Sequence, residues 1–359
     1  PVEITFDTLA KSQLVIFFTF IIFLALEATA PKRSYAPNFS QGSVGLFILF
    51  PLLVPLIVLA GYNALGTAFF ISFITARYGE LGLYPLMISY CAIFSAPLAA
   101  LFYARGNLVL ATAALCIVLL PVLLGGARQS LIISVFALIF CFAQKRRVAL
   151  IYFLALIVVL VPVGEVAAGV VKHIRNLPDL DSRIQFLTNL PQSLDNIKLG
   201  GEGLLRFAFY HIMSGIEVTN GGEFSYLLRT LLVWLPSIVD VFSLKPDDFE
   251  YDMFAAVMMG RHGTMHPTYF GSIYADARGF FPIWILFSFA IMRGVEYLLR
   301  SYPDYAAYLY LFCFYVSIMW ARGSLYAPTF MLFLAFIGTL VSKYLLNTGR
   351  KFPFNVSMR

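Results

Sequence analysis

Long apolar runs, separated by short polar breaks, dominate this chain. Most of the runs are close to the about 20 residues that a helix needs to cross a bilayer. They predict about ten membrane-spanning helices, at residues 13–30, 43–61, 63–76, 83–103, 107–124, 130–144, 148–170, 279–299, 304–321 and 325–346. The run at 63–76 is the shortest, and Tyr62-Asn63 before it could form a tight turn or a kink. Nine or eleven spans are also possible, because Lys32-Arg33 argues against the inner N-terminus that ten spans imply.

One long polar segment interrupts the runs between residues 171 and 278. It holds His173, His211, His262 and His266, the four histidines of the chain, and twelve of its nineteen acidic residues. The pattern thus divides the chain into three parts. These are an N-terminal transmembrane block of about seven helices (1–170), a large loop that contains helices (171–278), and a C-terminal block of three helices with a basic tail (279–359).

Within the loop, residues 226–244 are almost entirely apolar. They also include Arg229, Pro236 and Asp240, and charged side chains are costly in hydrocarbon. We therefore expect this stretch to form a helix that lies at the membrane interface rather than one that crosses the bilayer.

Composition supports an all-α, polytopic integral membrane protein. Hydrophobic residues make up 60% of the chain and charged residues 12%, and the mean hydropathy is +0.83. A soluble domain carries about 25% charged residues. The first run has a long apolar core and no clean cleavage site, so we expect it to be a retained span rather than a secretory signal. All four cysteines lie in apolar runs, which predicts neither a disulfide framework nor a thiolate metal site.

Charge gives the orientation. The cluster at 145–147 and the basic C-terminal tail predict a cytoplasmic location for both. Counting spans from there puts the loop of 171–278 outside. The N-terminus falls inside if all ten spans are real, although Lys32-Arg33 argues against that. The basic residues flank membrane spans, which is not the pattern of a nucleic-acid-binding protein.

Three arginines lie at predicted outer ends of spans. Arg128 follows Gly125-Gly-Ala, Arg322 precedes Gly323, and Arg278 lies where the loop returns to the membrane. The planar guanidinium matches phosphate oxygens and keeps its charge, so three of them at one face suit a pyrophosphate. The alternative is that each reaches to lipid headgroups or pairs with a carboxylate such as Asp276.

The stretch 260–279 is rich in chemistry. Arg261 is a further phosphate-binding candidate, and His262 and His266 could act as acid or base. Tyr269 and Tyr274 suit sugar binding, because an aromatic face packs on a pyranose and the hydroxyl bonds to it. The two histidines have the i, i+4 spacing of a metal pair, but neighbouring glycine and proline make a helix there unfavourable, so we expect no metal. Satisfied loop histidines are the alternative.

A second stretch, 200–211, predicts a helix that starts near Glu202. Glu202 is a candidate base for a sugar hydroxyl, with a helix-capping carboxylate as the alternative. Arg206, one turn later, is a candidate for binding phosphate at a helix start, and Tyr210 is a candidate for binding sugar. The acidic run at 247–252 matches no calcium-binding loop and is typical of a solvated face.

The chain resembles the bacterial oligosaccharide repeat-unit polymerases, the O-antigen polymerase (Wzy-like) family. The resemblance rests on Gly-Gly-Ala-Arg128, on the segment from His266-Pro-Thr-Tyr-Phe-Gly271 to Gly279, and on Arg322-Gly323. The order of many spans, one large outer loop and a basic inner tail also matches along the whole chain.

This resemblance implies a GT-C-like glycosyltransferase of the bacterial inner membrane, with its site facing the periplasm. Its substrates would be undecaprenyl-pyrophosphate-linked oligosaccharides, and it would need no cofactor or metal. Arg128, Arg206, Arg261 and Arg322 would bind the pyrophosphate, and Glu202, His262, His266 and Arg278 would be catalytic. Membrane lipids, a chain-length regulator and a flippase of the same pathway would be its partners. The alternatives are an O-antigen ligase, a lipid-linked glycan transporter and a scaffold.

Overall fold

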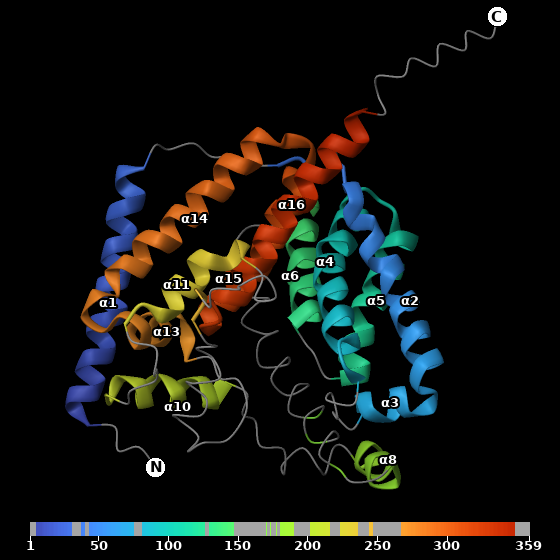
Figure 1. The fold of residues 1–359 in the computed structure, drawn as a ribbon, viewed down its shortest axis with the longest axis horizontal. Coiled ribbons are helices and arrows are strands. Elements are labelled where there is room, and N and C mark those ends of the chain that lie inside the picture. The colour runs from blue at the N-terminus through green and yellow to red at the C-terminus, as the bar shows by residue number, and fades with distance from the viewer. Residues whose placement is uncertain are drawn as a thin grey trace, which may run out of the picture. The chain divides into compact units, whose positions relative to one another are not determined.

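The computed structural model describes residues 5–30, 37–39, 43–74, 81–125, 129–146, 170, 173, 177, 180–189, 202–215, 223–235, 244–246 and 267–348. In these ranges every regular element is a helix (Figure 1). Five of the described helices are long and apolar enough to cross a membrane: Phe6–Thr29, Gly45–Leu65, Tyr84–Ala104, Pro282–Ser301 and Tyr326–Leu345. The all-α class and the membrane-embedded character agree with the sequence prediction, while the number of crossings stays a prediction.

Five helices begin and end within two residues of the predicted spans. They are α4 (Tyr84–Ala104), α5 (Leu108–Gly125), α6 (Gln129–Arg146), α15 (Pro303–Arg322) and α16 (Tyr326–Thr348). Backbone groups in hydrocarbon have no water to bond, so an apolar run has to form a continuous helix. The predicted span at 148–170 lies, apart from its last residue, outside the described residues.

The predicted span at 63–76 is corrected by the structure. The 3-10 turn η1 (Gly45–Ile48) leads into α2 (Leu49–Leu65), which continues past Tyr62-Asn63 and ends at Gly66 with a φ of +62°. The following α3 (Thr67–Ile74) has eight residues, so it is about 12 Å long against about 30 Å of hydrocarbon. A Cβ built on Gly61 would lie 2.2 Å from the ring of Phe69, so α3 packs closely against the end of α2.

The described helices form two compact units. Unit 1 comprises residues 1–36, 200–301 and 315–334, and unit 2 comprises 37–199, 302–314 and 335–359. This grouping cuts across the three sequence segments 1–170, 171–278 and 279–359, because the first helix belongs with the loop helices. Helices α15 and α16 each contribute residues to both units.

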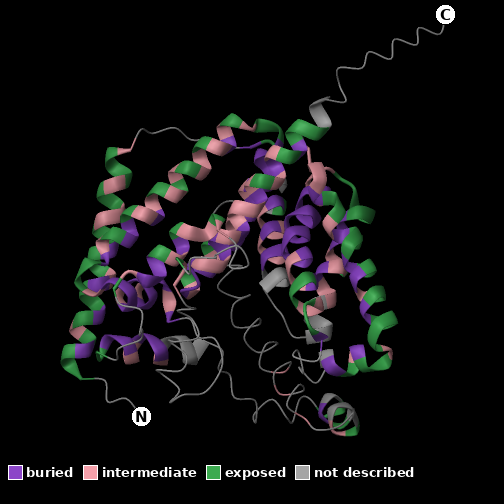
Figure 2. Cartoon of the chain, in the orientation of Figure 1, coloured by how far each residue is buried: buried purple, intermediate pink, exposed green. Residues whose placement is uncertain are grey.

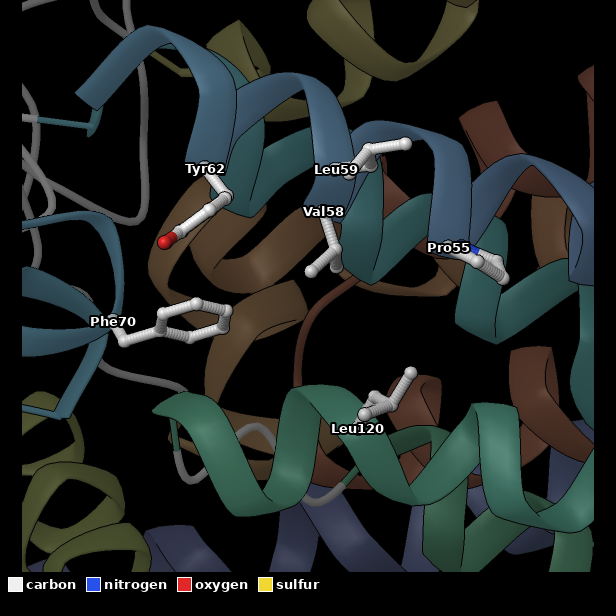
Figure 3. A pocket seen from close by; sticks show the side chains of 6 residues that line it. All are labelled: Pro55, Val58, Leu59, Tyr62, Phe70 and Leu120. Atoms are coloured by element: carbon white, nitrogen blue, oxygen red, sulfur yellow. The ribbon is translucent and has the colours of Figure 1, made fainter. Parts of the chain in front are cut away.

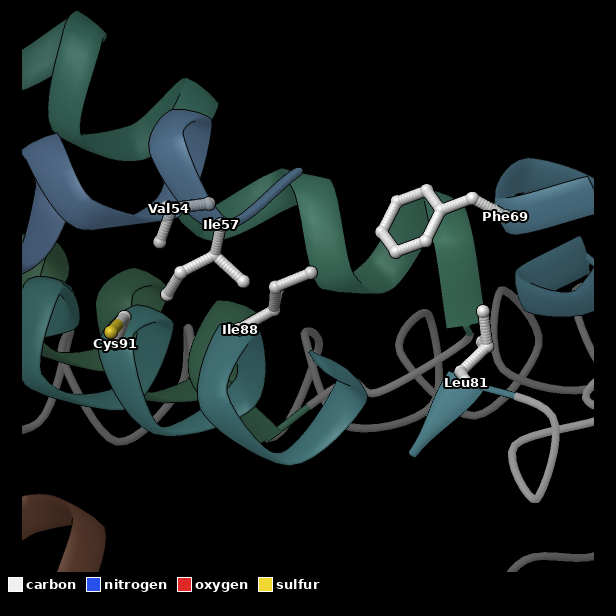
Figure 4. Packing of buried hydrophobic residues seen from close by; sticks show 6 residues of the cluster. All are labelled: Val54, Ile57, Phe69, Leu81, Ile88 and Cys91. Carbon is white, nitrogen blue, oxygen red and sulfur yellow. The ribbon is translucent and has the colours of Figure 1, made fainter. Parts of the chain in front are cut away.

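Unit 2 is built around α4. Residues from Cys91 to Phe102 are buried without a break, which marks a helix enclosed on all sides (Figure 2). Helices α2, α5 and α6 pack against it. One apolar cluster joins α2, α3 and α4 and comprises Val54, Ile57, Phe69, Leu81, Ile88 and Cys91 (Figure 4).

Unit 1 begins with α1 (Phe6–Thr29), whose polarity is reversed relative to a helix in water. Its buried residues are Thr8, Ser12, Val15 and Thr19, whereas its large apolar side chains are exposed. The hydroxyls of Ser12 and Thr19 donate to carbonyls four residues earlier, each at 2.7 Å. Small residues facing a neighbouring helix and apolar residues facing outward are typical of a helix in lipid.

Helices α1 and α14 (Pro282–Ser301) run in the same direction within unit 1 (Figure 1). The ring of Phe23 lies 6.5 Å from that of Tyr269, whose hydroxyl bonds to Ser288 in the first half of α14. Further along both helices, Glu27 forms an ion pair with Arg293 at 2.6 Å. Both helices therefore start on the same side of unit 1.

The loop contains helices, as expected: α8 (Leu180–Thr188), α10 (Glu202–Met213), α11 (Ser225–Leu231) and α13 (Thr268–Ala277). The helix predicted at 226–244 is interrupted at Leu235, and residues 236–243 lie outside the described residues. Helix α11 passes into the 3-10 turn η4 (Leu232–Trp234), and Leu235 is extended. Leu235 precedes Pro236, and a residue before proline is forced out of the helical region.

Candidate functional site

One face of α13 holds the turn between α15 and α16. Thr268, Ser272 and Asp276 follow each other at helical spacing on this face, with Ser272 0% and Asp276 1% exposed. The Ser272 hydroxyl donates to the Gly323 carbonyl at 2.6 Å. Gly323 has a φ of +102°, and a Cβ on it would lie 2.6 Å from the Thr268 carbonyl oxygen. Only glycine lets this turn approach α13 so closely.

Asp276 caps the helix α11 from fifty residues away. Its carboxylate accepts from the backbone N–H of Tyr226 at 2.7 Å and of Leu227 at 3.1 Å, and from the indole N–H of Trp284 at 2.8 Å. The α11 residue in the capping position, Phe224, offers no side-chain acceptor. A carboxylate at a helix start satisfies free N–H groups and favours the helix dipole. Burial raises the pKa of Asp276, and these hydrogen bonds oppose that rise.

Tyr226 continues this chain of contacts to α16. Its ring is buried 5.7 Å from Trp284. Its hydroxyl accepts from the backbone N–H of Leu325 at 2.8 Å and of Tyr326 at 3.2 Å. Asp276 thus fixes the start of α11, and α11 fixes the start of α16.

Two cations lie over the ring of Tyr326. The guanidinium carbon of Arg229 is 4.8 Å and the Lys245 Nζ is 4.7 Å from its centroid, both within the reach of a cation–π interaction. Arg229 donates to the Pro246 carbonyl at 2.5 Å. Lys245 donates to the Leu235 carbonyl at 3.1 Å and to the Tyr326 hydroxyl. These contacts hold both cations at the start of α16.

Arg322 ends α15, four residues before Tyr326. Its Nε is buried and has no hydrogen-bond partner among the described residues, and the same is true of the indole nitrogen of Trp320, two residues earlier. A buried N–H group without a partner is rare in folded proteins and points to a ligand or water that accepts from it. We call Arg229, Lys245 and Arg322, together with Tyr326, the cationic turn.

The tyrosines proposed for sugar binding have different surroundings. Tyr269 is buried, and its hydroxyl donates to Ser288 at 2.8 Å, so this side chain packs α13 on α14. Tyr274 is half-buried, with the guanidinium carbon of Arg278 5.9 Å from its centroid. Tyr274 and Arg278 are thus brought together. Their roles in binding and catalysis stay predictions.

Helix α10 begins at Glu202, where the sequence pattern places a helix start. The side chains of Glu202 and Arg206 lie outside the described part, and that of Tyr210 is half-buried. Three residues of the other α10 face, Ala208, Phe209 and Ile212, are buried. Phe209 lies against Gly271, where an added Cβ would meet its ring at 3.2 Å. Helix α10 is therefore packed on α13 through its apolar face.

Four predicted site residues, Arg128, Arg261, His262 and His266, lie outside the described residues. Among the described residues, no three histidine, cysteine or acidic side chains come close enough to hold a metal ion. A hollow of about 480 Å³ in unit 2 is lined by Pro55, Val58, Leu59, Tyr62, Phe70 and Leu120 (Figure 3). Its lining is almost wholly apolar, so the hollow suits a hydrocarbon chain rather than polar chemistry.

The sequence patterns did not identify Arg229, Lys245 or Asp276 as site residues. In the sequence, Arg229 interrupts an apolar run, and Lys245 adjoins an acidic run. A signal for Asp276 was present, since Thr268, Ser272 and Asp276 recur every four residues. His211 was also passed over; its Nδ1 is buried without a partner among the described residues, and burial lowers its pKa.

The function of the chain has to be inferred from its own residues and their geometry. No family model matches the chain, and no curated protein or solved structure is significantly similar to it.

Proposed function

We propose that this protein polymerises undecaprenyl-pyrophosphate-linked oligosaccharide repeat units at the outer face of the bacterial inner membrane. The acceptor sugar hydroxyl attacks the anomeric carbon of the donor. The new glycosidic bond forms as the bond between that carbon and the pyrophosphate oxygen breaks. The hydroxyl proton passes to a base, and the lipid pyrophosphate leaves.

The observation that carries the proposal is the cationic turn. Arg229 and Lys245 lie over the Tyr326 ring, and Arg322 is in the same turn with a buried N–H that has no partner among the described residues. Charge develops on the leaving pyrophosphate in the transition state. Fixed cations at a membrane end stabilise that charge without the cost of reorganising solvent.

A role of Arg322 in stabilising the leaving group also accounts for the close fixation of the turn between α15 and α16. Stabilising a leaving group depends on cations that are already in place before the reaction. The turn is fixed by Ser272 on one side and by the Tyr226 hydroxyl on the other. Such double fixation is what a preorganised anion site requires.

The test is the ladder of glycan chain lengths on a gel, in a strain that lacks the chromosomal copy and carries a variant. We expect Arg322→Ala to lower the yield of chains longer than one repeat by about 100-fold, the typical cost of removing one charge-stabilising donor. Arg322→Lys keeps the charge but loses the planar fork, so it should restore the ladder only in part.

Arg300→Ala is the matched control. Arg300 lies near the C-terminal end of α14 and pairs with Glu296. It should leave the ladder intact. A full ladder from Arg322→Ala, with the protein present in the membrane, would contradict the proposal. Free polymer that accumulates without transfer to core lipid in the deletion strain would instead identify a ligase.

A further inference from the structure

We infer that Asp276 is a positioning residue for the anion site, acting through α11 on the cationic turn. The inference rests on the proposed function, because it concerns the site that would bind the pyrophosphate. Asp276 is 1% exposed, and its carboxylate accepts from the α11 backbone and from the Trp284 indole. It therefore acts through other residues and does not touch the substrate.

Asp276 caps the first turn of α11. Asp276 supplies the acceptors for the free N–H groups of Tyr226 and Leu227 at the start of α11. Its main-chain carbonyl also accepts from Phe224 at 2.9 Å. Three bonds from one residue thus fix both the position and the direction of the first turn of α11.

The second step is what α11 carries. Tyr226 and Arg229 are three residues apart, so they project from neighbouring positions on the helix. Tyr226 bonds to the first N–H groups of α16, and Arg229 covers the Tyr326 ring. A shift of α11 would move Arg229 and the start of α16 together.

The third step is the charge. The indole of Trp284 and the α11 N–H groups are all donors to the Asp276 carboxylate. An asparagine has nearly the same shape but one acceptor oxygen, and its NH₂ would face a donor. Asp276→Asn should therefore loosen the start of α11 without leaving a cavity.

The experiment is a calorimetric titration of the purified full-length protein in detergent with inorganic pyrophosphate. Loss of folded protein lowers the number of binding sites at constant Kd, whereas a displaced site raises Kd at a constant number of sites. We expect Asp276→Asn to raise Kd about tenfold with an unchanged number of sites, as loss of an outer partner does at metal sites.

A double-mutant cycle tests whether Asp276 acts on the site through Arg229. In the Arg229→Ala background, Asp276→Asn should raise Kd by clearly less than in the wild-type background, because one of the residues it positions is already absent. Trp284→Phe removes one donor and leaves the bonds to α11, so its effect should be smaller. Ser288→Ala is the matched control, since it removes the buried hydrogen bond by which α13 is held to α14 instead.

An unchanged Kd for Asp276→Asn, or a fall only in the number of sites, would overturn the inference. So would the same change in Kd with and without Arg229. If Arg322→Ala weakens binding while Asp276→Asn has no effect, the proposed function stands and the positioning role fails. If the wild-type protein binds no pyrophosphate, both fail.

Discussion

Gly323 ties the cationic turn to α13 through its lack of a side chain. Its φ of +102° strains any other residue, and an added Cβ would lie 2.6 Å from the Thr268 carbonyl oxygen. We expect Gly323→Ala to lower the free energy of unfolding by about 1–3 kcal/mol. The measurement is denaturant unfolding of the purified protein in detergent, monitored by circular dichroism.

Gly294→Ala is the control for that change. Gly294 lies within α14, and a Cβ there meets nothing within 4 Å. The substitution should be neutral or stabilising by up to about 1 kcal/mol, because alanine favours a helix. Equal losses from both variants would mean that the close approach at Gly323 does not matter.

His211 gives a prediction about pH. Burial lowers its pKa below the ordinary value of 6.5, so the folded state disfavours the charged ring. Between the lowered pKa and 6.5, the unfolded chain binds more protons, and stability rises with pH. This contribution is fully present above pH 6.5 and is lost as the pH falls through the folded pKa.

The check is the melting temperature in detergent between about pH 8 and about pH 5.5, a range that spans the histidine titration. We expect the wild-type value to fall more steeply on acidification than that of His211→Gln. Parallel curves would show that His211 is not the group responsible.

Side-chain direction explains which site residues could be predicted. In the segment 260–279 the sequence pattern draws attention to the tyrosines and the arginine, whose roles in binding and catalysis stay predictions. Tyr269 packs inward on Ser288, while Ser272 and Asp276 carry the contacts to the turn. The pattern of a short helix does not say which neighbour each face meets, because the neighbours come from distant parts of the chain.

At the scale of elements, the Tyr226 hydroxyl joins α11 to the start of α16. Tyr226 accepts from two N–H groups at the start of α16 and is buried. Tyr226→Phe keeps the ring and leaves those two groups without this acceptor. We expect a loss of about 1–3 kcal/mol in the free energy of unfolding, the cost of an unsatisfied buried donor.

Hydrogen exchange locates that effect. The amides of Leu325 and Tyr326 should exchange faster in Tyr226→Phe, while those within α4 should not change. Tyr62→Phe is the control, because Tyr62 is exposed at the hollow of unit 2. If the amides at 325 and 326 keep their protection, the hydroxyl does not hold the start of α16.

Helix bounds were the most predictable feature of the fold. In lipid, a run of apolar residues forms one helix, and a turn follows where the run ends. The rule failed at α1, which starts at Phe6 rather than near residue 13. Its first turns are polar and are held by the Thr5 cap and by an ion pair between Asp7 and Lys11. Counting apolar residues cannot detect such a start.

For the whole molecule, the direction of α1 bears on a conflict in the charge pattern. Helices α1 and α14 run in the same direction, and α14 starts where the predicted outer loop ends. Helix α3 has only eight described residues. We therefore expect nine crossings, with the start of α1 outside. Lys32-Arg33 then falls on the inner side together with the basic cluster at 145–147, as the preference for inner positive charge requires.

Labelling with a membrane-impermeant maleimide tests this arrangement in a variant that lacks the native cysteines. Asp7→Cys and Gly279→Cys should both react in intact cells after the outer membrane is opened. Ser301→Cys, at the far end of α14, should react only after the inner membrane is permeabilised. Asp7→Cys that behaves like Ser301→Cys would restore an even number of crossings.

The bond between Trp284 and Asp276 has an optical consequence. The chain has three tryptophans, at positions 234, 284 and 320, and all of them belong to unit 1. Fluorescence excited at the red edge of tryptophan absorption therefore comes from unit 1 alone, and unit 2 contributes none. Because the Trp284 indole donates to the Asp276 carboxylate that caps α11, the wavelength of its emission should change when that hydrogen bond changes. The protein thus carries an intrinsic fluorophore at the place where ligand binding would be observed.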